Sequence, residues 1–265
     1  MVIGSSTSDY QRLHNSISKA NSALSSSIEK LSTGKNINKA ADNPGAIAIL
    51  AALESQTRGI SQQMNTAQDE YSMLQVADGA LSNTGDALGR ISELATQAAN
   101  GTLTDSDRQA IQGEIDQLTQ QIDKTANNTT FNTKQLLDGS LNVRLSTGDN
   151  YAQAAATSAG LGISGISVTT QENASKALST VQGAIDNLSS QRGNIGAVMN
   201  GLTSELNNLQ NSLVNTMSAQ STIGDVDYAS EIIKNNSADL QSQFAIKAFN
   251  MNKVNASRVL GLIGA

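Results

Sequence analysis

Apolar residues spaced three and four positions apart dominate the second half of the chain, with Arg192 in the one gap of the pattern. The apolar positions are Leu178, Val181, Ile185, Leu188, Ile195, Met199, Leu202, Leu206, Leu209 and Leu213. Alternating steps of three and four are typical of a heptad seam. They predict a helix over about 171–223, roughly 80 Å long at 1.5 Å per residue. Because an isolated helix is only marginally stable, it must pack on a partner.

A second seam in the first half of the chain supplies that partner. It contains Ile60, Met64, Ala67, Tyr71, Leu74, Leu81, Leu88, Ile91, Ala95 and Ala98. We expect this helix to end at "NGT", because Gly101 suits the position that follows a helix. A third helix follows "TLTDSD", where Thr104 or Asp105 can cap the first turn; its apolar stripe is Ile111, Ile115, Leu118 and Ile122. The three stripes predict a helical bundle.

Both ends of the chain are also amphipathic at helical spacing, and we expect them to pair with each other. The apolar positions are Leu13, Ile17, Leu24, Ile28 and Leu31 in the first segment and Ile233, Leu240, Phe244, Met251, Val254 and Leu262 in the last. The breaks "STGKNINKAADNPGA" and "STIGDVDYA" separate these segments from the rest. They divide the chain into a terminal pair, 1–42 with 225–265, and a central bundle, 43–224.

The strand-like segment is "LNVRLSTGDN", in which apolar and polar residues alternate before a Gly-Asp turn. A small, Gly-rich stretch follows it. We expect a β-hairpin and loop over about 140–170 that caps one end of the bundle. The predicted fold class is therefore mainly α: a long-helix coiled-coil bundle with a small β-hairpin and with the N- and C-terminal helices paired.

Composition and charge exclude several classes of partner. Aromatic residues make up 3% of the chain, and there is no Trp, one Pro and no Cys, which favours packed helices over a sheet and excludes disulfides. A net charge of −6 without a basic cluster argues against binding to nucleic acid or an anionic membrane. No apolar run is long enough for membrane insertion, and no signal-peptide pattern opens the chain. Export is expected to use another route.

Catalytic constellations are missing. With one His and no Cys, the chain cannot build a Cys–His pair or a His-based metal cluster, and His14 is interpreted as a surface or interface residue. The carboxylate pairs Asp69–Glu70 and Asp225–Asp227 lack the spacing of a calcium loop and are expected to be solvated helix charges. We therefore predict no enzymatic activity, no cofactor and no metal.

Several long segments resemble bacterial flagellin. They are "NSALSSSIEKLSTGKNINKAADNPGAIAI", "VADGALSNTGDALGRISELATQAANGT", "IGDVDYASEI" and the ending "NMNKVNASRVLGLIGA". The resemblance covers about residues 5–145 and 170–265 and implies the two helical layers of that family, the terminal pair (D0) and the bundle with its hairpin (D1). Only about 30 residues join Leu141 to Thr170, so the outer D2 and D3 domains of many flagellins are absent.

The resemblance implies a structural subunit that polymerises with copies of itself into the flagellar filament for swimming motility. The amphipathic terminal segments are too poorly covered to be stable as an isolated pair, so we expect the apolar residues given for them above to take part in polymerisation. It implies secretion by the flagellar type III system to the extracellular flagellum, and an export chaperone, cap and hook-associated proteins as partners. Two departures, "VNASRVLGLIGA" without a Pro and "SAQSTIGD" without the family's Arg-rich run, alter the D0–D1 junction. The alternatives are the related hook–filament junction protein and, in another class, a soluble coiled-coil signalling or binding rod, against which the paired breaks argue.

The stretch "GRISELATQAANGT" carries apolar residues on two helix faces. Ile91, Ala95 and Ala98 share the bundle seam, whereas Arg90 and Leu94 fall about 100° away. The resemblance implies that this second face packs between subunits and, in the monomer, binds vertebrate Toll-like receptor 5. The positions matching that recognition pattern are Arg90, Glu93, Leu94, Gln97 and, on the third helix, Glu114; Gly89 replaces the Gln that usually precedes the arginine.

Overall fold

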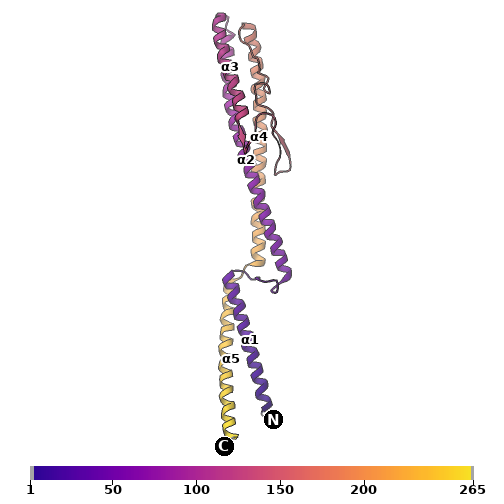
Figure 1. The fold of residues 1–265 in the computed structure, drawn as a ribbon, viewed down its shortest axis with the longest axis vertical. Helices are drawn as coiled ribbons and strands as arrows, with labels where there is room; N and C mark the ends of the chain where they lie inside the picture. The colour runs from indigo at the N-terminus through magenta and orange to yellow at the C-terminus, as the bar shows by residue number, and fades with distance from the viewer. Residues whose placement is uncertain (1–2, 264–265) are drawn as a thin grey trace. The chain divides into compact units, whose positions relative to one another are not determined.

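The computed structural model describes residues 3–263, and the side chains of residues 10–254. Its described part contains five helices and four short strands (Figure 1). The helices are α1 (Ile3–Thr33), α2 (Pro44–Ala98), α3 (Asp105–Asn128), α4 (Gln171–Gly224) and α5 (Tyr228–Ile263). The strands are β1 (Thr130–Phe131), β2 (Lys134–Gln135), β3 (Asn142–Arg144) and β4 (Asn150–Ala152). The chain divides into unit 1, Met1–Arg58 with Val214–Ala265, and unit 2, Gly59–Leu213.

The helix starts are set locally by capping side chains. In each of α2 to α5, a side-chain oxygen accepts a hydrogen bond from a backbone N–H of the first turn. The four caps are Asn43, Thr104, Thr170 and Asp227. At α3 the cap is reciprocal, because the side chain of Asp107 also accepts from the backbone N–H of Thr104. Such caps satisfy N–H groups that the helix leaves unpaired.

The core of unit 2 lies between α2, α3 and α4, which run side by side in Figure 1. Its largest fully buried side chains on these helices are Leu74, Leu81, Leu88, Ile91, Ile115, Ile122, Ile195 and Leu202. These residues belong to the three stripes predicted from the spacing. The predicted bundle is confirmed, and α4 spans almost the range expected for it.

The gap in the α4 seam is filled differently from our prediction. Gln191, not Arg192, is buried in the seam, and the Gln153 amide donates to its side-chain oxygen at 2.8 Å. Arg192 lies at the surface and donates to Asp78 of α2 at 2.8 Å. Steps of three and four between Leu188 and Ile195 allow either residue, but the buried positions of α4 run Ala177, Val181, Ala184, Leu188, Gln191 and Ile195. This register includes Gln191 and leaves Arg192 beside the seam.

Two antiparallel hairpins follow α3. The predicted one is confirmed as β3–β4, in which Val143 is opposite Tyr151. The other, β1–β2, was not predicted. Its turn places Asn132 and Thr133 at φ of 48° and 65°, in the left-handed region. An Asn-Gly dipeptide is the usual sequence signal of such a turn. The turn is Asn132–Thr133 without a glycine, so it could not be predicted from the usual dipeptide.

The segment 145–168, which we expected to cap one end of the bundle, lies instead along its side. Three polar anchors hold it at successive levels of unit 2. Glu70 accepts from Ser146 N at 3.0 Å, Asp123 from Ser158 N at 2.7 Å, and Gln112 from Val168 N at 2.7 Å. Glu70 is thus a structural anchor and not only a solvated helix charge. Between the anchors, apolar side chains of the segment enter the core of unit 2.

Candidate functional site

Helices α1 and α5 pack together in unit 1, as predicted, and the fully buried side chains between them are small or polar. The buried residues of this seam are Ala20 and Ser27 on α1 and Glu231, Ala238 and Ser242 on α5. Ser27 Oγ donates to Glu231 Oε1 at 2.8 Å, and Ser242 Oγ donates to Asn21 Oδ1 at 3.0 Å. Apolar burial in the seam comes mainly from half-buried residues of α1 and from the rings of Tyr10 and Phe249, which pack edge to face with centroids 5.3 Å apart.

Two groups in the seam increase its polarity further. The Glu231 carboxylate is buried, and the hydrogen bond from Ser27, helped by Lys234 at 3.0 Å, holds its pKa below the ordinary value of a glutamate. One turn along α5, the side-chain nitrogen of Asn235 is buried and donates to nothing among the described residues. An unpaired buried donor costs free energy. The pairing of α1 with α5 is accordingly specific, and its buried polar groups lower its net stability.

The opposite face of α5 is apolar and exposed. We call this surface, formed by Ile233, Leu240, Phe244, Met251 and Val254, the α5 outer face. Each of its side chains is at least half exposed, and Phe244 reaches 69%. Five large apolar residues exposed along one helix are unusual for a monomeric protein and mark an interaction surface.

The sequence-predicted residues of the terminal helices thus divide into two groups. Leu13, Ile17, Leu24 and Leu31 of α1 are half-buried beside α5, whereas Ile28 is exposed. We had expected the apolar stripes of both helices to face each other, but α5 turns its stripe outward and pairs through Ala238 and its neighbours. The side chain of Leu262 lies outside the described residues.

A second candidate surface lies in unit 2, where α2 faces α3. Arg90 Nη2 donates to Glu114 Oε1 at 2.9 Å and Arg90 Nη1 to Glu93 Oε2 at 3.0 Å. These bonds, first the one to Glu114, raise the pKa of Arg90. Gln97 is exposed one turn beyond Glu93. We call these four residues, Arg90, Glu93, Gln97 and Glu114, the Arg90 surface.

Leu94 is not part of that exposed surface, because only 2% of it is accessible. This corrects our expectation of an apolar residue presented on a free second face. The buried arc of α2 is wide here, since α3 covers the Arg90 side while Leu188 of α4 lies against Gly85 on another. The spacing showed that Arg90 and Leu94 share a second face of the helix, but it could not show that neighbouring helices bury Leu94.

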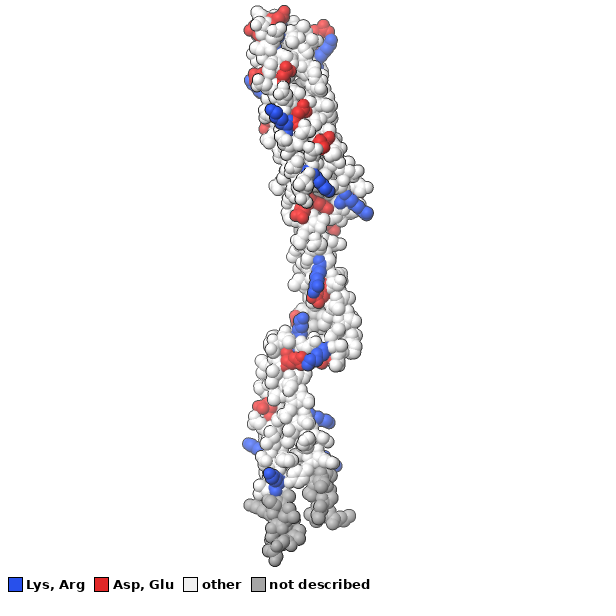
Figure 2. Space-filling model, viewed as in Figure 1, with Lys and Arg blue, Asp and Glu red and all other residues white. Residues whose placement is uncertain are grey.

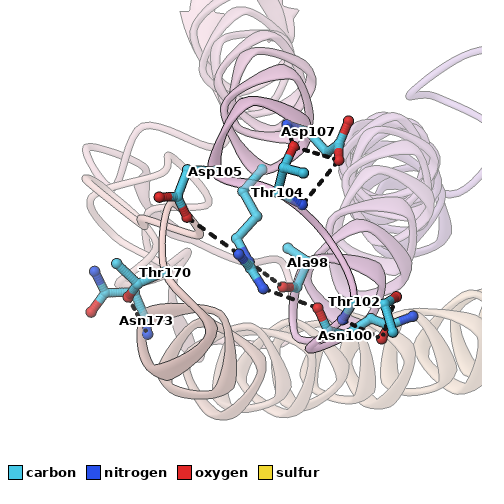
Figure 3. Close-up of polar contacts among 9 residues, drawn as sticks. Ala98, Asn100, Thr102, Thr104, Asp105, Asp107, Thr170 and Asn173 are labelled. Atoms are coloured by element: carbon cyan, nitrogen blue, oxygen red, sulfur yellow. Dashed lines mark hydrogen bonds and ion pairs between the residues drawn. The ribbon is translucent and has the colours of Figure 1, made fainter.

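The turn between α2 and α3 is held by a buried arginine. Arg108 Nε donates to Ala98 O and Arg108 Nη2 to Asn100 O, each at 3.0 Å, where α2 ends (Figure 3). These carbonyls belong to the last turn and the residues after it, where helical partners run out. Sequence reasoning missed this role, because a single Arg in a first helical turn gives no signal of what it reaches.

Charged side chains are scattered over the face drawn in Figure 2, and neither sign forms a large patch there. In the described part of the chain, no group of three or more His, Asp or Glu side chains lies close enough together to hold a metal ion. None of the described helices contains a stretch that is long and apolar enough to cross a bilayer. The two surfaces above are therefore the candidate functional sites.

Comparisons with known proteins find similarity over both halves of the chain. The family model described as the bacterial flagellin N-terminal helical region matches residues 5–142, and the model of the C-terminal helical region matches residues 178–263. The flagellin of Bacillus subtilis (strain 168) is 33% identical over 93% of this chain and 95% of its own length.

Solved structures show a similar likeness. The crystal structure of Bacillus cereus flagellin has a TM-score of 0.50 and 28% identity, over 55% of this chain and 88% of that one. A putative flagellar hook-associated protein from Vibrio parahaemolyticus has a TM-score of 0.59 over 69% of this chain and all of its own. At 16% identity, the second likeness concerns the fold alone.

Proposed function

The chain belongs to the bacterial flagellin family, and on that premise we propose that the α5 outer face is where its copies pack in the filament. As a family member it is a structural subunit of the bacterial flagellar filament and not an enzyme. We further propose that residues 1–42 with 225–265 act as the inner layer, D0. Residues 43–224 then act as the surrounding layer, D1.

The exposure of the α5 outer face is the observation that carries this proposal. Fully burying a large apolar side chain contributes about 1.5–3 kcal/mol, so its five partly exposed residues offer about 5–10 kcal/mol per subunit on assembly. The seam between α1 and α5 contains a buried carboxylate and an unpaired Asn235 nitrogen, which reduce what the pair gains by itself. Burial of the α5 outer face against neighbouring copies therefore adds to the stability of the terminal pair and couples its folding to polymerisation.

Replacing Phe244 and Met251 by Ser tests the proposal. Both side chains project from the α5 outer face, so the double variant should keep the fold of unit 2 and lose polymerisation. The matched control is Gln241→Ser on the same helix, at an exposed polar position. Negative-stain electron microscopy and sedimentation report fibre formation directly. Filaments from the double variant at the control's yield would refute the assignment, as would filaments from a chain lacking residues 1–30.

The same assay separates the two alternatives. A hook–filament junction protein would assemble a short layer on other subunits, so long filaments made from this chain alone exclude that role. A soluble coiled-coil rod would sediment as a stable dimer that never forms fibres. We expect long fibres.

The second proposed activity is recognition of the monomer by vertebrate Toll-like receptor 5 through the Arg90 surface. Its support is the resemblance at these positions together with their exposure: Arg90 and Glu114 are about half exposed and linked across two helices. An ordered guanidinium between two carboxylates presents a fixed polar pattern to a partner. Leu94, lying beneath, would support the surface and not contact the receptor unless the helices part.

An Arg90→Ala, Glu114→Ala double variant is the appropriate test of receptor recognition. Adding Leu94→Ala would confuse the result, because truncating a buried Leu costs about 2–5 kcal/mol. The control is Arg58→Ala, which removes an exposed i, i+4 ion pair from another part of α2. We expect the double variant to lose receptor signalling and the control to keep it. Equal signalling from the two proteins would sink this proposal.

Export as an unfolded chain by the flagellar type III system, with an export chaperone, cap and hook-associated proteins as partners, is part of the same proposal. The buried polar groups of the seam support it, because the Glu231 carboxylate and the unpaired Asn235 nitrogen lower the stability of the terminal helices in the monomer. Helices of low stability are easily kept unfolded. Hydrogen exchange provides the test. Backbone amides of 10–30 and 230–254 should exchange rapidly in the monomer and slowly in the filament; strong protection in the monomer would contradict the proposal.

A further inference from the structure

The chain contains two Asn-Gly steps in different surroundings, Asn100–Gly101 and Asn200–Gly201. The first lies in the turn after α2, where Asn100, Gly101 and Thr102 are all exposed. The second lies in the interior of α4. Asn-Gly is the dipeptide in which the next backbone nitrogen reaches the Asn side chain most easily, because glycine has no side chain to obstruct the approach.

The turn holds the Asn100 side chain folded over its own backbone. Asn100 Oδ1 accepts from Thr102 N at 3.1 Å and from Thr102 Oγ1 at 3.0 Å, as Figure 3 shows. Such a loop folds the Asn side chain back along the peptide that follows it, which here is the Gly101 peptide. The two donors also point at the oxygen on which negative charge develops if that carbon is attacked, and such donors stabilise the charge.

The backbone on either side of the Asn100 side chain is pinned as well. Asn100 N donates to Gln97 O at 3.1 Å, and Asn100 O accepts from Leu103 N at 3.3 Å and from Arg108 Nη2 at 3.0 Å. The Gly101 N–H lies beyond α2 and before α3, outside both helical hydrogen-bond ladders. The Asn100 side chain and backbone are thus held in place next to a backbone N–H that neither helix uses, and holding reacting groups in place favours an intramolecular reaction.

We propose that Asn100 is a self-modifying residue that converts spontaneously to aspartate and isoaspartate. The Gly101 nitrogen loses its proton to water or hydroxide and bonds to the Asn100 side-chain carbonyl carbon. The bond from that carbon to the amide nitrogen breaks, and ammonia leaves with a proton from water. Water then opens the five-membered imide at either carbonyl. The net change is one water consumed and one ammonia released, without an oxidant or enzyme.

Asn200 should not react in the folded protein. Its neighbour Gly201 is in the middle of α4, where the backbone N–H is committed to a hydrogen bond within the helix and helical dihedral angles keep it away from the side-chain carbon. The same dipeptide is therefore protected at one site and activated at the other by secondary structure alone. The molecule supplies its own matched control.

The product changes the turn in a definite way. Position 100 gains a negative charge in either product. Isoaspartate also adds a methylene to the main chain. Its free carboxylate is the former backbone carbonyl group of residue 100, which now accepts from Arg108. The guanidinium of Arg108 would pair with that carboxylate, because charge-assisted bonds are stronger than the present one. The modification thus tightens one contact of the α2–α3 turn while lengthening its backbone.

Incubating the full-length monomer in mildly alkaline buffer, followed by trypsin digestion and mass spectrometry, tests the proposal. Cleavage after Arg90, Arg108, Arg192 and Lys234 releases residues 91–108 and 193–234, so each Asn-Gly step is read in its own peptide. We expect conversion at Asn100 at least about tenfold faster than at Asn200 in native protein. In denaturant the two rates should become nearly equal. Equal rates in the native protein would overturn the proposal.

Variants of Thr102 test the stated cause. Thr102→Val removes the hydroxyl donor to Asn100 Oδ1, and we expect it to slow conversion at Asn100 severalfold while leaving Asn200 unchanged. Thr102→Ser keeps that donor and should keep the native rate. If the Val and Ser variants react at the same rate, the two-donor arrangement is not what activates Asn100, and the assignment fails.

Discussion

The clearest test of the packing in unit 2 is removal of the buried Arg108 guanidinium. Only 8% of its side chain is exposed, and it donates to Ala98 O and Asn100 O at 3.0 Å each. A hydrogen bond from a charged group contributes about 1.5–3 kcal/mol. The Asp105 contact, at 3.4 Å to a carboxylate that is 89% exposed, adds little. We therefore expect Arg108→Ala to destabilise unit 2 by about 3–5 kcal/mol.

The matched control is Arg192→Ala. Arg192 also bridges two helices of unit 2, but its side chain is 42% exposed where it pairs with Asp78. Exposed ion pairs contribute about 0.2–1 kcal/mol. Urea unfolding of the full-length monomer, followed by circular dichroism and by hydrogen exchange of α3 amides, measures both. If the two variants lose similar stability, the buried cap is not what holds the α2–α3 turn.

Three further predictions follow from named contacts. The pKa of Glu231 is lowered mainly by Ser27, so its carboxylate stabilises the terminal pair at neutral pH and this contribution is lost as pH falls through the lowered pKa. Glu231→Gln should flatten the acid-induced rise in hydrogen exchange of α5, and an unchanged acid profile would contradict this. Gly160→Ala should destabilise unit 2, because its Cβ would lie 2.4 Å from Ala155 O; a wild-type melting curve would show otherwise. Gly89→Ala, in open space on α2, should stabilise by about 0.5–1 kcal/mol in the same melting assay.

Helices and their starts could be predicted from the sequence because their causes are local. Steps of three and four placed α4 within a residue or two of its observed ends, and the capping residue Thr104 marked where α3 begins. Capping depends on residues three positions apart. The terminal pairing was also predictable in outline, since two amphipathic ends with coincident breaks have few other arrangements.

The contacts of each helix face could not be predicted, because spacing shows which residues share a face and not what covers it. Leu94 was assigned to a free surface and is buried. Phe244 was assigned to polymerisation on a helix of the terminal pair, and only the structure shows that it faces away from α1. The position of segment 145–168 along the bundle could not be predicted for a similar reason. In the sequence, its anchors Glu70, Gln112 and Asp123 look like ordinary polar positions on a helix. Only the structure shows that they accept from backbone N–H groups of this segment.

The sequence by itself thus determined the long helices, their ends and the flagellin resemblance, all of which depend on near-neighbour spacing and on ordered motifs. The tertiary structure alone decided that α5 pairs through Ala238 and Ser242 and leaves the residues of the α5 outer face exposed. It also decided that Arg90 and Glu114 form one surface and that Asn100 is held for reaction while Asn200 is protected. The first two features depend on contacts between residues far apart in the chain. The third depends on which backbone groups a helix has already paired. The local pattern of residues contains neither kind of information.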